Sequence, residues 1–498
     1  MSRAHHHFQN TQLYIICSPG RSAISKSILP HELLNPTLLF PSIFGKSKIA
    51  FIASSPTSCH SIAITTDGRA YGWGRNETGQ LGLGYSSAVV PAPALLNVND
   101  DESIKFVGAG VGKYHTILVG SNGLAYASGG NLCGQLGINN MGARGIDKFR
   151  KCVVVGQLGG DEEEEDDVKI VQASCGENIS ALISSAGHLY TTGSSEHGQL
   201  GNGETGEYII AAGKMGYANC AKFMKRSMFV QSEIDAAGGI PSNMMTGKGV
   251  DSSGKTKCVA LEDSGRICLA NVSCGKSHIV AVEAPTVGHS HAPRVFTWGC
   301  GDYGCLGHGI QADEYTPRLV GALRGPIFAS NHPVSASAGS NCTMILTKHG
   351  HVYYMGKHKQ NSEATMRPTL VDALANNRHV AVSIAAGSHH VFCATKSGVT
   401  VSWGHGNHGE LGYGKDENKS SSKPKFVNDL DSCLVTGVAC GMGHTLFIVR
   451  NEDDEDAKAL KNVAKVEEKD VAQFVEEIKG KQVDDGEGPA KKKQKSKK

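Results

Sequence analysis

The stretch Gly112-Lys113-Tyr114-His115-Thr116-Ile117-Leu118 contains a pattern that recurs seven times in this chain. A small residue and two variable residues are followed, usually, by a histidine and then by a short apolar run. The equivalent positions are His60, His115, Ile179, His278, Cys342, His390 and His444. Self-similarity at a spacing of roughly 50 to 65 residues predicts a closed or stacked repeat architecture.

Each repeat is predicted to form about four short antiparallel strands. The first strand is apolar and ends at a turn such as Thr66-Asp67-Gly68-Arg69, in which Asp-Gly favours a hairpin because both residues tolerate positive φ. The second strand ends in glycine, and a loop of the type Gly-Gln-Leu-Gly follows. Trp-Gly ends this strand at Trp73, Trp298 and Trp403, and the loops include Gly79–Gly82, Gly134–Gly137 and Gly198–Gly201. One repeat therefore predicts one blade of an all-β propeller.

Composition agrees with a repeat-built globular protein. The chain has 62 glycines in 498 residues, which indicates many tight turns, and 40% of its residues are hydrophobic. The net charge of only +2 indicates that the protein surface as a whole does not bind nucleic acid. No run reaches the roughly 18 apolar residues that span a bilayer, so we expect an intracellular protein without a membrane partner.

The fifteen cysteines form no C-x-x-C pair. Cys175, Cys274 and Cys440 each precede a repeat glycine, which is typical of a small buried residue. The closest pair in the repeats that fit the pattern best, Cys300 and Cys305, spans a predicted loop. Reduced structural cysteines are therefore expected, with zinc or disulfide chemistry as the alternatives.

The histidines, the Trp-Gly pairs and the Gly-Gln-Leu-Gly loops resemble the regulator of chromosome condensation superfamily, in register over about residues 50 to 450. Three stretches are similar to its telophase-disc subgroup: Val295–Gly299 through Pro317–Val320, the fifth repeat ending at Met355-Gly356, and Ser402-Trp403-Gly404 through Gly409–Gly414. The resemblance implies a seven-bladed β-propeller, and the spacing of the repeats agrees with it.

The predicted organisation has three parts. Residues 1–50 form an N-terminal segment, residues 51–450 form the propeller, and residues 451–498 form a charged helical and lysine-rich tail. Seven first strands but only six second strands leave the last blade, after His444, without its outer half. In a ring that half must come from the N-terminus, and Leu13–Cys17 is the candidate strand.

The resemblance further implies an interaction protein that regulates a small GTPase of the Rac, Ral or Ran type together with mitotic chromosome, spindle or microtubule events. It implies a nuclear location, with chromosome, centromere or spindle association in mitosis, and allows a cytoplasmic one. The alternative is a guanine nucleotide exchange factor for a Ran-type GTPase on chromatin. Exchange needs no covalent chemistry, because it depends on tighter binding of the nucleotide-free GTPase.

Partner contacts are expected in an insertion at about residues 204–268, since the spacing from Ile179 to His278 is unusually long. Its basic and aromatic candidates are Lys214, Tyr217, Lys222, Phe223, Lys225 and Arg226. A solvated loop is the alternative.

The C-terminal tail carries a second candidate. Val471, Phe474, Val475 and Ile478 predict one apolar stripe of a helix, and the terminal lysines predict a nuclear-import or polyanion-binding tail, or a merely solubilising one. These lysines are Lys491, Lys492, Lys493, Lys495, Lys497 and Lys498.

The repeated residues are interpreted as structural. His60, His115, His278, His390 and His444, with Trp73, Trp298 and Trp403, are expected to pack and to form hydrogen bonds, and no catalytic residue, metal site, cofactor or small-molecule substrate is predicted. Gly249–Thr256 fits the phosphate-binding pattern G-x-x-x-x-G-K-T, but no strand precedes it. A turn in the insertion is therefore favoured over a nucleotide-binding enzyme.

Overall fold

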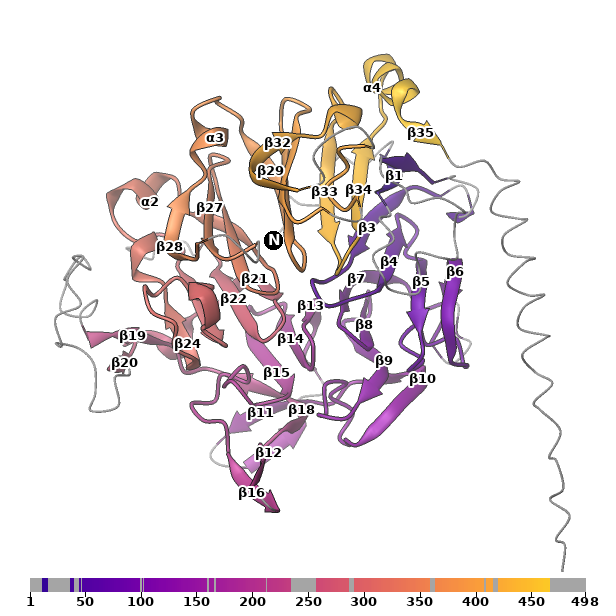
Figure 1. Cartoon of the computed structure of the whole chain (residues 1–498). Coiled ribbons are helices and arrows are strands. Elements are labelled where there is room, and N and C mark those ends of the chain that lie inside the picture. The colour runs from indigo at the N-terminus through magenta and orange to yellow at the C-terminus, as the bar shows by residue number, and fades with distance from the viewer. Residues whose placement is uncertain are drawn as a thin grey trace, which may run out of the picture.

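The structure is a computed structural model that describes residues 11–16, 36–39, 44–45, 47–98, 101, 103–158, 161–164, 167–211, 213–233, 257–285, 291–358, 363–406, 409–414 and 420–465. Its strands are arranged in sheets around a central axis, and the chain runs round the ring from β3 to β34 (Figure 1). The short helices α2 (Pro326–Ser330), α3 (Asp372–Ala375) and α4 (Asp454–Ala459) lie at the periphery. The all-β propeller expected from the repeats is therefore confirmed.

The first, second, fifth and sixth sheets are each formed by four consecutive strands. The first two contain β3 (Ile49–Ala53), β4 (His60–Thr65), β5 (Ala70–Asn76) and β6 (Ser87–Leu96), then β7 (Phe106–Val111), β8 (His115–Gly120), β9 (Ala125–Asn131) and β10 (Ala143–Lys151). The other two contain β25 (Pro333–Ala338), β26 (Cys342–Thr347), β27 (Val352–Gly356) and β28 (Thr365–Leu370), then β29 (Ala381–Ala386), β30 (His390–Thr395), β31 (Thr400–Gly404) and β32 (Ser421–Phe426).

The third and fourth sheets have two additional strands each. The third contains β13 (Ile170–Cys175), β14 (Ile179–Ser184), β15 (Leu189–Gly193) and β18 (Cys220–Arg226), extended by β11 (Val154–Leu158) and β12 (Asp161–Glu164). The fourth contains β21 (Leu269–Cys274), β22 (His278–Glu283), β23 (Val295–Gly299) and β24 (Glu314–Leu319), extended by β19 (Val230–Ser232) and β20 (Cys258–Ala260).

The last sheet of the ring is composite, because it joins strands from both ends of the described chain. Its order is β33 (Val435–Cys440), β34 (Thr445–Arg450), β1 (Thr11–Ile16), β2 (Thr37–Leu38) and β35 (Ala464–Lys465). Strand β1 pairs antiparallel with β34, from Thr11 opposite Arg450 to Ile16 opposite Thr445. The sequence predicts Leu13–Cys17 for this place; residues 13–16 lie in β1, and Cys17 lies outside the described residues.

The number of blades that a continuous stretch of chain forms is smaller than the seven expected. Six blades, rather than seven, are built in order from a single run of the chain. The count of seven is reached only when the composite sheet is added to these six. The difference arises because the last repeat supplies two strands and depends on β1 for its third.

The core lies within and between the blades. In β4, β8, β14, β22, β26 and β30 every residue is buried, and apart from the histidines and Glu283 these strands consist of apolar or small residues. The inner strands line an axial cavity of about 220 Å³, to which β3, β7, β13, β21, β25, β29 and β33 all contribute. Among the described residues no helix is long and apolar enough to cross a membrane.

Candidate functional site: the third-blade hairpin and the histidine ring

The segment between β15 and β21, predicted as one insertion over residues 204–268, is divided by a blade strand. Strand β18 pairs antiparallel with β15 and so serves as the outer strand of the third blade. The described residues before β18 form a hairpin outside the blade, and those after it include β19 and β20, which extend the fourth sheet. This correction was not accessible from repeat spacing alone, because β18 has no Gly-Gln-Leu-Gly or His marker of its own.

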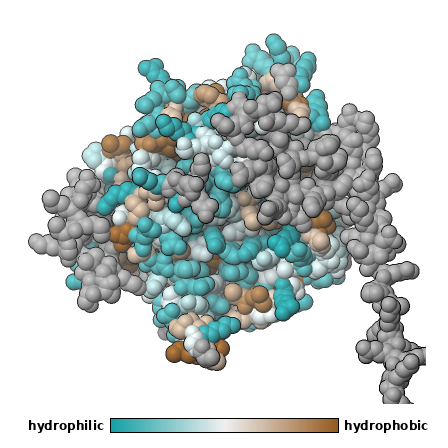
Figure 2. Space-filling view, in the orientation of Figure 1, coloured by the Kyte–Doolittle hydropathy of each residue, from teal (hydrophilic) through white to brown (hydrophobic). Residues whose placement is uncertain are grey.

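The part before β18 forms a two-stranded hairpin of β16 (Tyr208–Ala211) and β17 (Lys214–Gly216). Among the described strands it pairs with no other, and it projects from the ring at the bottom of Figure 1. Its large apolar side chains are exposed, with 55% for Tyr208, 72% for Ile209, 54% for Ile210 and 40% for Met215. Figure 2 shows brown, hydrophobic atoms at the corresponding lower end of the molecule.

Both faces of this hairpin are apolar. Ile209 lies opposite Met215, and a side chain at Gly216 would collide with Tyr208 and Ile210, so these two cover the other face. An isolated two-stranded hairpin is marginal in water, and a protruding apolar surface marks an interaction site. The exposed run Tyr208–Ile210 was visible in the sequence as three apolar residues in a polar insertion, but sequence reasoning favoured the basic residues.

The neck of the hairpin is tied to the third blade by Ser195. Its hydroxyl donates a hydrogen bond of 2.8 Å to the Thr205 carbonyl, and its backbone N–H donates one of 3.3 Å to the Asn219 side chain. The Ala218 N–H donates to the Thr205 carbonyl at 3.2 Å and closes the neck. The hairpin is therefore fixed to the loop that follows β15.

The predicted basic and aromatic cluster is not one surface. Lys214 is exposed on β17 and Tyr217 is half-buried beside it. The other four candidates, Lys222, Phe223, Lys225 and Arg226, lie on β18.

On β18 these residues serve the blade. Phe223 is 0% exposed and belongs to the core, so it is not available to a partner. Arg226 donates a hydrogen bond to the Thr191 hydroxyl at 2.8 Å, and burial lowers the pKa of its guanidinium. Only two of the six candidates, Lys214 and Tyr217, therefore belong to the projecting hairpin.

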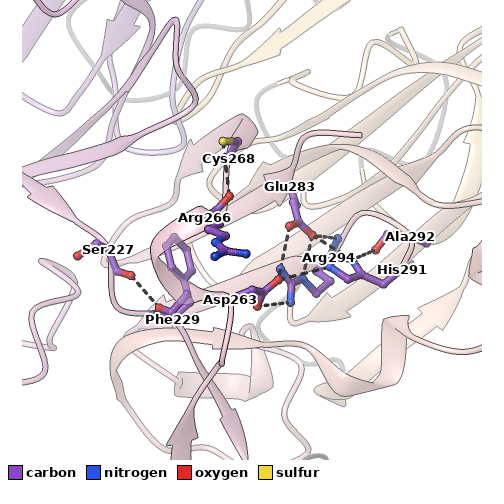
Figure 3. Close-up of polar contacts among 10 residues, drawn as sticks. Ser227, Phe229, Asp263, Arg266, Cys268, Glu283, His291, Ala292 and Arg294 are labelled. Carbon is purple, nitrogen blue, oxygen red and sulfur yellow. Dashed lines mark hydrogen bonds and ion pairs between the residues drawn. The ribbon is translucent and has the colours of Figure 1, made fainter. Parts of the chain in front are cut away.

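The part after β18 returns to the fourth blade through an ion-pair cluster (Figure 3). The Arg294 guanidinium donates to both oxygens of Glu283 at 2.8 Å and to the Asp263 carboxylate at 2.8 and 3.1 Å. Glu283 and Arg294 are buried and Asp263 is half-buried. Because Asp263 lies in the returning segment, this cluster attaches the segment to the blade.

The electrostatics of this cluster follow from the pairing. The hydrogen bonds from Arg294 lower the pKa of the Asp263 carboxyl. Burial alone would lower the pKa of Arg294, but the bonds to Glu283 and Asp263 raise it. Asp263, Glu283 and His291 also offer a possible metal-ligand set, but the guanidinium already occupies the position between the two carboxylates. The cluster is therefore best understood as an anchor.

The repeated histidines, here called the histidine ring (His60, His115, His278, His390 and His444), lie inside the propeller and link neighbouring blades. Each is at most 5% exposed, and each Nε2 lies within 2.8 to 3.1 Å of a hydroxyl in the next blade. The five pairs are His60–Thr116, His115–Ser180, His278–Thr343, His390–Thr445 and His444–Ser61.

The direction of these hydrogen bonds can be assigned in three pairs. The hydroxyls of Ser180, Thr343 and Thr445 donate to backbone carbonyls, so they accept from the imidazole and place its proton on Nε2. The neutral ring is favoured, because burial lowers the pKa of all five histidines, to about 3 for His60, His115 and His390 and about 4 for His278 and His444. These contacts are packing and hydrogen-bonding contacts.

Steric crowding explains why glycine occupies the position three residues before four of the ring histidines. A Cβ at Gly112 would lie 2.1 Å from Cε1 of His115, and Gly275, Gly387 and Gly441 contact their histidines in the same way. Four of the five ring histidines therefore leave no room for a side chain at this position, whereas His60 has Thr57 there. The three tryptophans are at most 3% exposed, and Trp298 donates to the Gln199 carbonyl of the preceding blade at 2.9 Å.

Three predicted features lie outside the described residues. These are the phosphate-loop-like segment Gly249–Thr256, the apolar stripe from Val471 to Ile478, and the terminal lysines Lys491 to Lys498.

Comparisons with known proteins agree with the fold. The sequence model of the "Regulator of chromosome condensation (RCC1) repeat" matches residues 67–119, 294–346 and 398–448. Protein RCC2 of Mus musculus is 30% identical over 449 residues, covering 89% of this chain and 76% of that protein. The RCC2 homolog of Xenopus laevis is 29% identical over 452 residues, covering 89% and 77%.

Among solved structures, Prp20p of Saccharomyces cerevisiae superposes with a TM-score of 0.61 at 17% identity, covering 95% of this chain and 96% of that one. That structure is described together with its binding properties to Gsp1p and histones. At this identity the likeness supports the propeller fold alone.

Proposed function

The chain belongs to the regulator of chromosome condensation superfamily and is similar to RCC2 proteins over most of its length, and from this premise we propose that it is a non-catalytic propeller protein that regulates a small GTPase during mitosis. The observation that carries the proposal is the β16–β17 hairpin, which exposes apolar side chains on a rigid ring. The hairpin is proposed as the contact surface for the GTPase.

The physical basis is the contrast between the hairpin and its support. A partner that covers Tyr208, Ile209, Ile210 and Met215 would gain roughly 25 cal/mol for each Å² of apolar surface removed from water. The Ser195 bonds hold the neck in place, so little ordering entropy opposes binding. Prp20p, a protein of the same fold, is described as binding the protein Gsp1p and histones, which favours GTPase and chromatin partners here as well.

The test measures release of a fluorescent guanine nucleotide from Rac-, Ral- and Ran-type GTPases. The full-length protein is compared with a variant in which residues 207–217 are replaced by a short Gly-Ser linker, which leaves the blade strand β18 intact. Ile209→Asp is the point variant. Ile327→Asp, at a residue 70% exposed on α2, is its matched control.

Each outcome has a defined meaning. Acceleration on one GTPase that is lost with the hairpin and with Ile209→Asp, but not with Ile327→Asp, supports an exchange factor. If that GTPase is of the Ran type, the chromatin-bound exchange factor is favoured. Stable binding without acceleration supports a sequestering regulator. Absence of binding to every GTPase contradicts the proposal.

The location follows the same proposal. We place the protein in the nucleus and on mitotic chromosomes or the spindle, and assign import or polyanion binding to the terminal lysines. Replacing Lys491, Lys492, Lys493, Lys495, Lys497 and Lys498 with glutamine should shift a fluorescent fusion toward the cytoplasm. An unchanged distribution would assign the tail no role in location.

We further propose that the composite sheet acts as a seventh blade. The hydrogen bonds His390–Thr445 and His444–Ser61 continue the inter-blade series across both of its junctions. Removing residues 1–16 takes away β1 and should lower the melting temperature clearly, whereas removing residues 1–10 should not. Equal melting temperatures would contradict a closing role for β1.

A further inference from the structure

Three different metal-ligand types meet at the junction of the third and fourth blades. His197 lies in the loop after β15, Cys300 directly follows β23, and Asp313 directly precedes β24. One ligand atom of each residue lies within 4.8 Å of the other two, and all three residues are half-buried. The group was not visible in the sequence, because its members are more than 100 residues apart at the extremes and follow no metal-binding spacing.

Backbone contacts hold the three residues in place. The His197 N–H donates to the Gln199 side chain at 2.7 Å, and the Cys300 N–H donates to the Ser277 carbonyl at 2.9 Å. The Gly301 N–H donates to one oxygen of Asp313 at 2.9 Å. A Cβ at Gly301 would lie 1.9 Å from the Ala312 carbonyl oxygen, so the two loops of the fourth blade are in close contact.

The surroundings of the group are acidic. Nδ1 of His197 pairs with Asp313 at 3.0 Å, and this bond raises the pKa of the histidine, to which Glu196 and Asp302 also contribute. Burial, with Asp313 and Asp302, raises the pKa of the Cys300 thiol to about 12. Each of these charges would favour a cation placed between the three side chains.

The Asp263–Glu283–His291 group provides the contrast. There an arginine guanidinium fills the position between the carboxylates, and it donates to both of them. In the blade-junction group two of the three side chains, His197 and Asp313, pair directly with each other. A metal ion can replace such a hydrogen bond, because both side chains can then bind the ion instead of each other.

We propose that His197, Cys300 and Asp313 bind a zinc ion that joins the third and fourth blades. Imidazole nitrogen, thiolate sulfur and carboxylate oxygen are the ligands that zinc takes at about 2.0 to 2.3 Å in a tetrahedral arrangement. Such ligands lie roughly 3.4 to 3.8 Å apart, so small side-chain rotations from the present positions suffice. Water supplies the fourth ligand.

Binding has a defined proton balance. Cys300 must lose its thiol proton to solvent, and the imidazole must be neutral at the nitrogen that binds, so one or two protons are released for each ion bound. The ion would also hold the loop that contains Ser195, two residues before His197, which fixes the neck of the hairpin. The proposed site departs from the expectation, drawn from the sequence, that the chain has no metal site.

The test uses the full-length protein after treatment with a chelator, with Co²⁺ as the spectroscopic probe and Zn²⁺ in competition. We expect one Co²⁺ with a thiolate-to-cobalt charge-transfer band, displaced by Zn²⁺. Cys300→Ser should remove the band, and His197→Gln and Asp313→Asn should weaken binding at least tenfold. Cys268→Ser, at another half-buried cysteine, is the matched control and should leave the band unchanged.

Two results would overturn the proposal. One is the absence of a stoichiometric band in the wild-type protein. The other is a band that persists in Cys300→Ser, since this would place the metal on other cysteines. Far-UV circular dichroism of each variant separates loss of the site from loss of the fold, and Asp313→Asn, which keeps the shape of the side chain, provides a second variant if Cys300→Ser does not fold.

Discussion

The histidine ring and the β16–β17 hairpin use their side chains in opposite ways. The ring buries polar imidazoles and bonds each of them through Nε2 to a hydroxyl across five blade junctions, whereas the hairpin exposes apolar side chains and pairs with no third strand among those described. The ring recurs with the repeat, and the hairpin occurs once, in the third blade. Regular sequence thus encodes the scaffold, and a local exception encodes the proposed contact surface.

The largest expected effect concerns acid sensitivity of the ring. The folded-state pKa values of about 3 to 4 lie below the ordinary value of 6.5, so the unfolded chain binds more protons between these limits. The stability that the five neutral histidines contribute is therefore fully present above pH 6.5, and it falls as pH decreases toward 4. Each histidine contributes up to about 1.4 kcal/mol per pH unit in this window.

Urea unfolding at several pH values checks this slope. The free energy of unfolding of His115→Gln should fall less steeply with decreasing pH than that of the wild type. The difference in slope should correspond to about one bound proton. A hairpin variant such as Ile209→Asp should keep the wild-type slope. If His115→Gln keeps it as well, the buried imidazole does not contribute as described.

The next largest effect concerns the ion-pair anchor that attaches the segment after β18 to the fourth blade. Arg294→Leu leaves Glu283 buried without its partner and should lower the free energy of unfolding by about 3 to 5 kcal/mol. The double variant Arg294→Leu with Glu283→Gln should regain part of this loss, because the buried charge is gone. Chemical denaturation measures both, and an equal loss in the two variants would contradict the ion-pair explanation.

A smaller effect is expected from the glycine that makes room for a ring histidine. Gly112→Ala places a methyl group against His115 and should cost about 1 to 3 kcal/mol of unfolding free energy. Gly265→Ala is the control, since no atom lies within 4 Å of its added Cβ. Thermal unfolding of the two variants should differ clearly, and similar melting temperatures would contradict the steric argument.

The smallest effect on stability is expected from the hairpin itself. Ile209→Asp should change the free energy of unfolding by less than about 0.5 kcal/mol, because the side chain is 72% exposed. Its effect should appear only in binding of the GTPase. A marked loss of stability would indicate that the hairpin packs against the propeller and does not serve as a free surface.

The repeats made the propeller predictable because a similar buried strand recurs in each blade. At four of the seven repeat positions a histidine lies at or next to the start of this strand and is preceded by a glycine without room for a Cβ, and His115 with Gly112 illustrates the unit. The division of the insertion by β18 was missed, because Phe223 reads in sequence as an aromatic residue among lysines. In the structure it fills the space over Gly137 in the second blade's loop.

Contacts between distant parts of the chain were beyond sequence reasoning. Arg294 pairs with Asp263, but no recognisable motif in the sequence marks the two residues as partners. His197 pairs with Asp313 only because the third and fourth blades lie side by side. Neither pair has a fixed spacing that a single sequence could reveal. Such pairs depend on the assembled ring.

The pairing of β1 with β34 also orders events in time. During synthesis Thr11 emerges early and its partner Arg450 emerges near the end of the described chain, which at ordinary elongation rates is roughly 20 to 90 seconds later. Six blades can form in sequence during that interval, while β1 waits with its backbone groups unpaired by the ring. The final strand thus decides when the nascent chain becomes a closed body, and a ribosome that stalls before residue 445 would leave an open arc with two exposed edges.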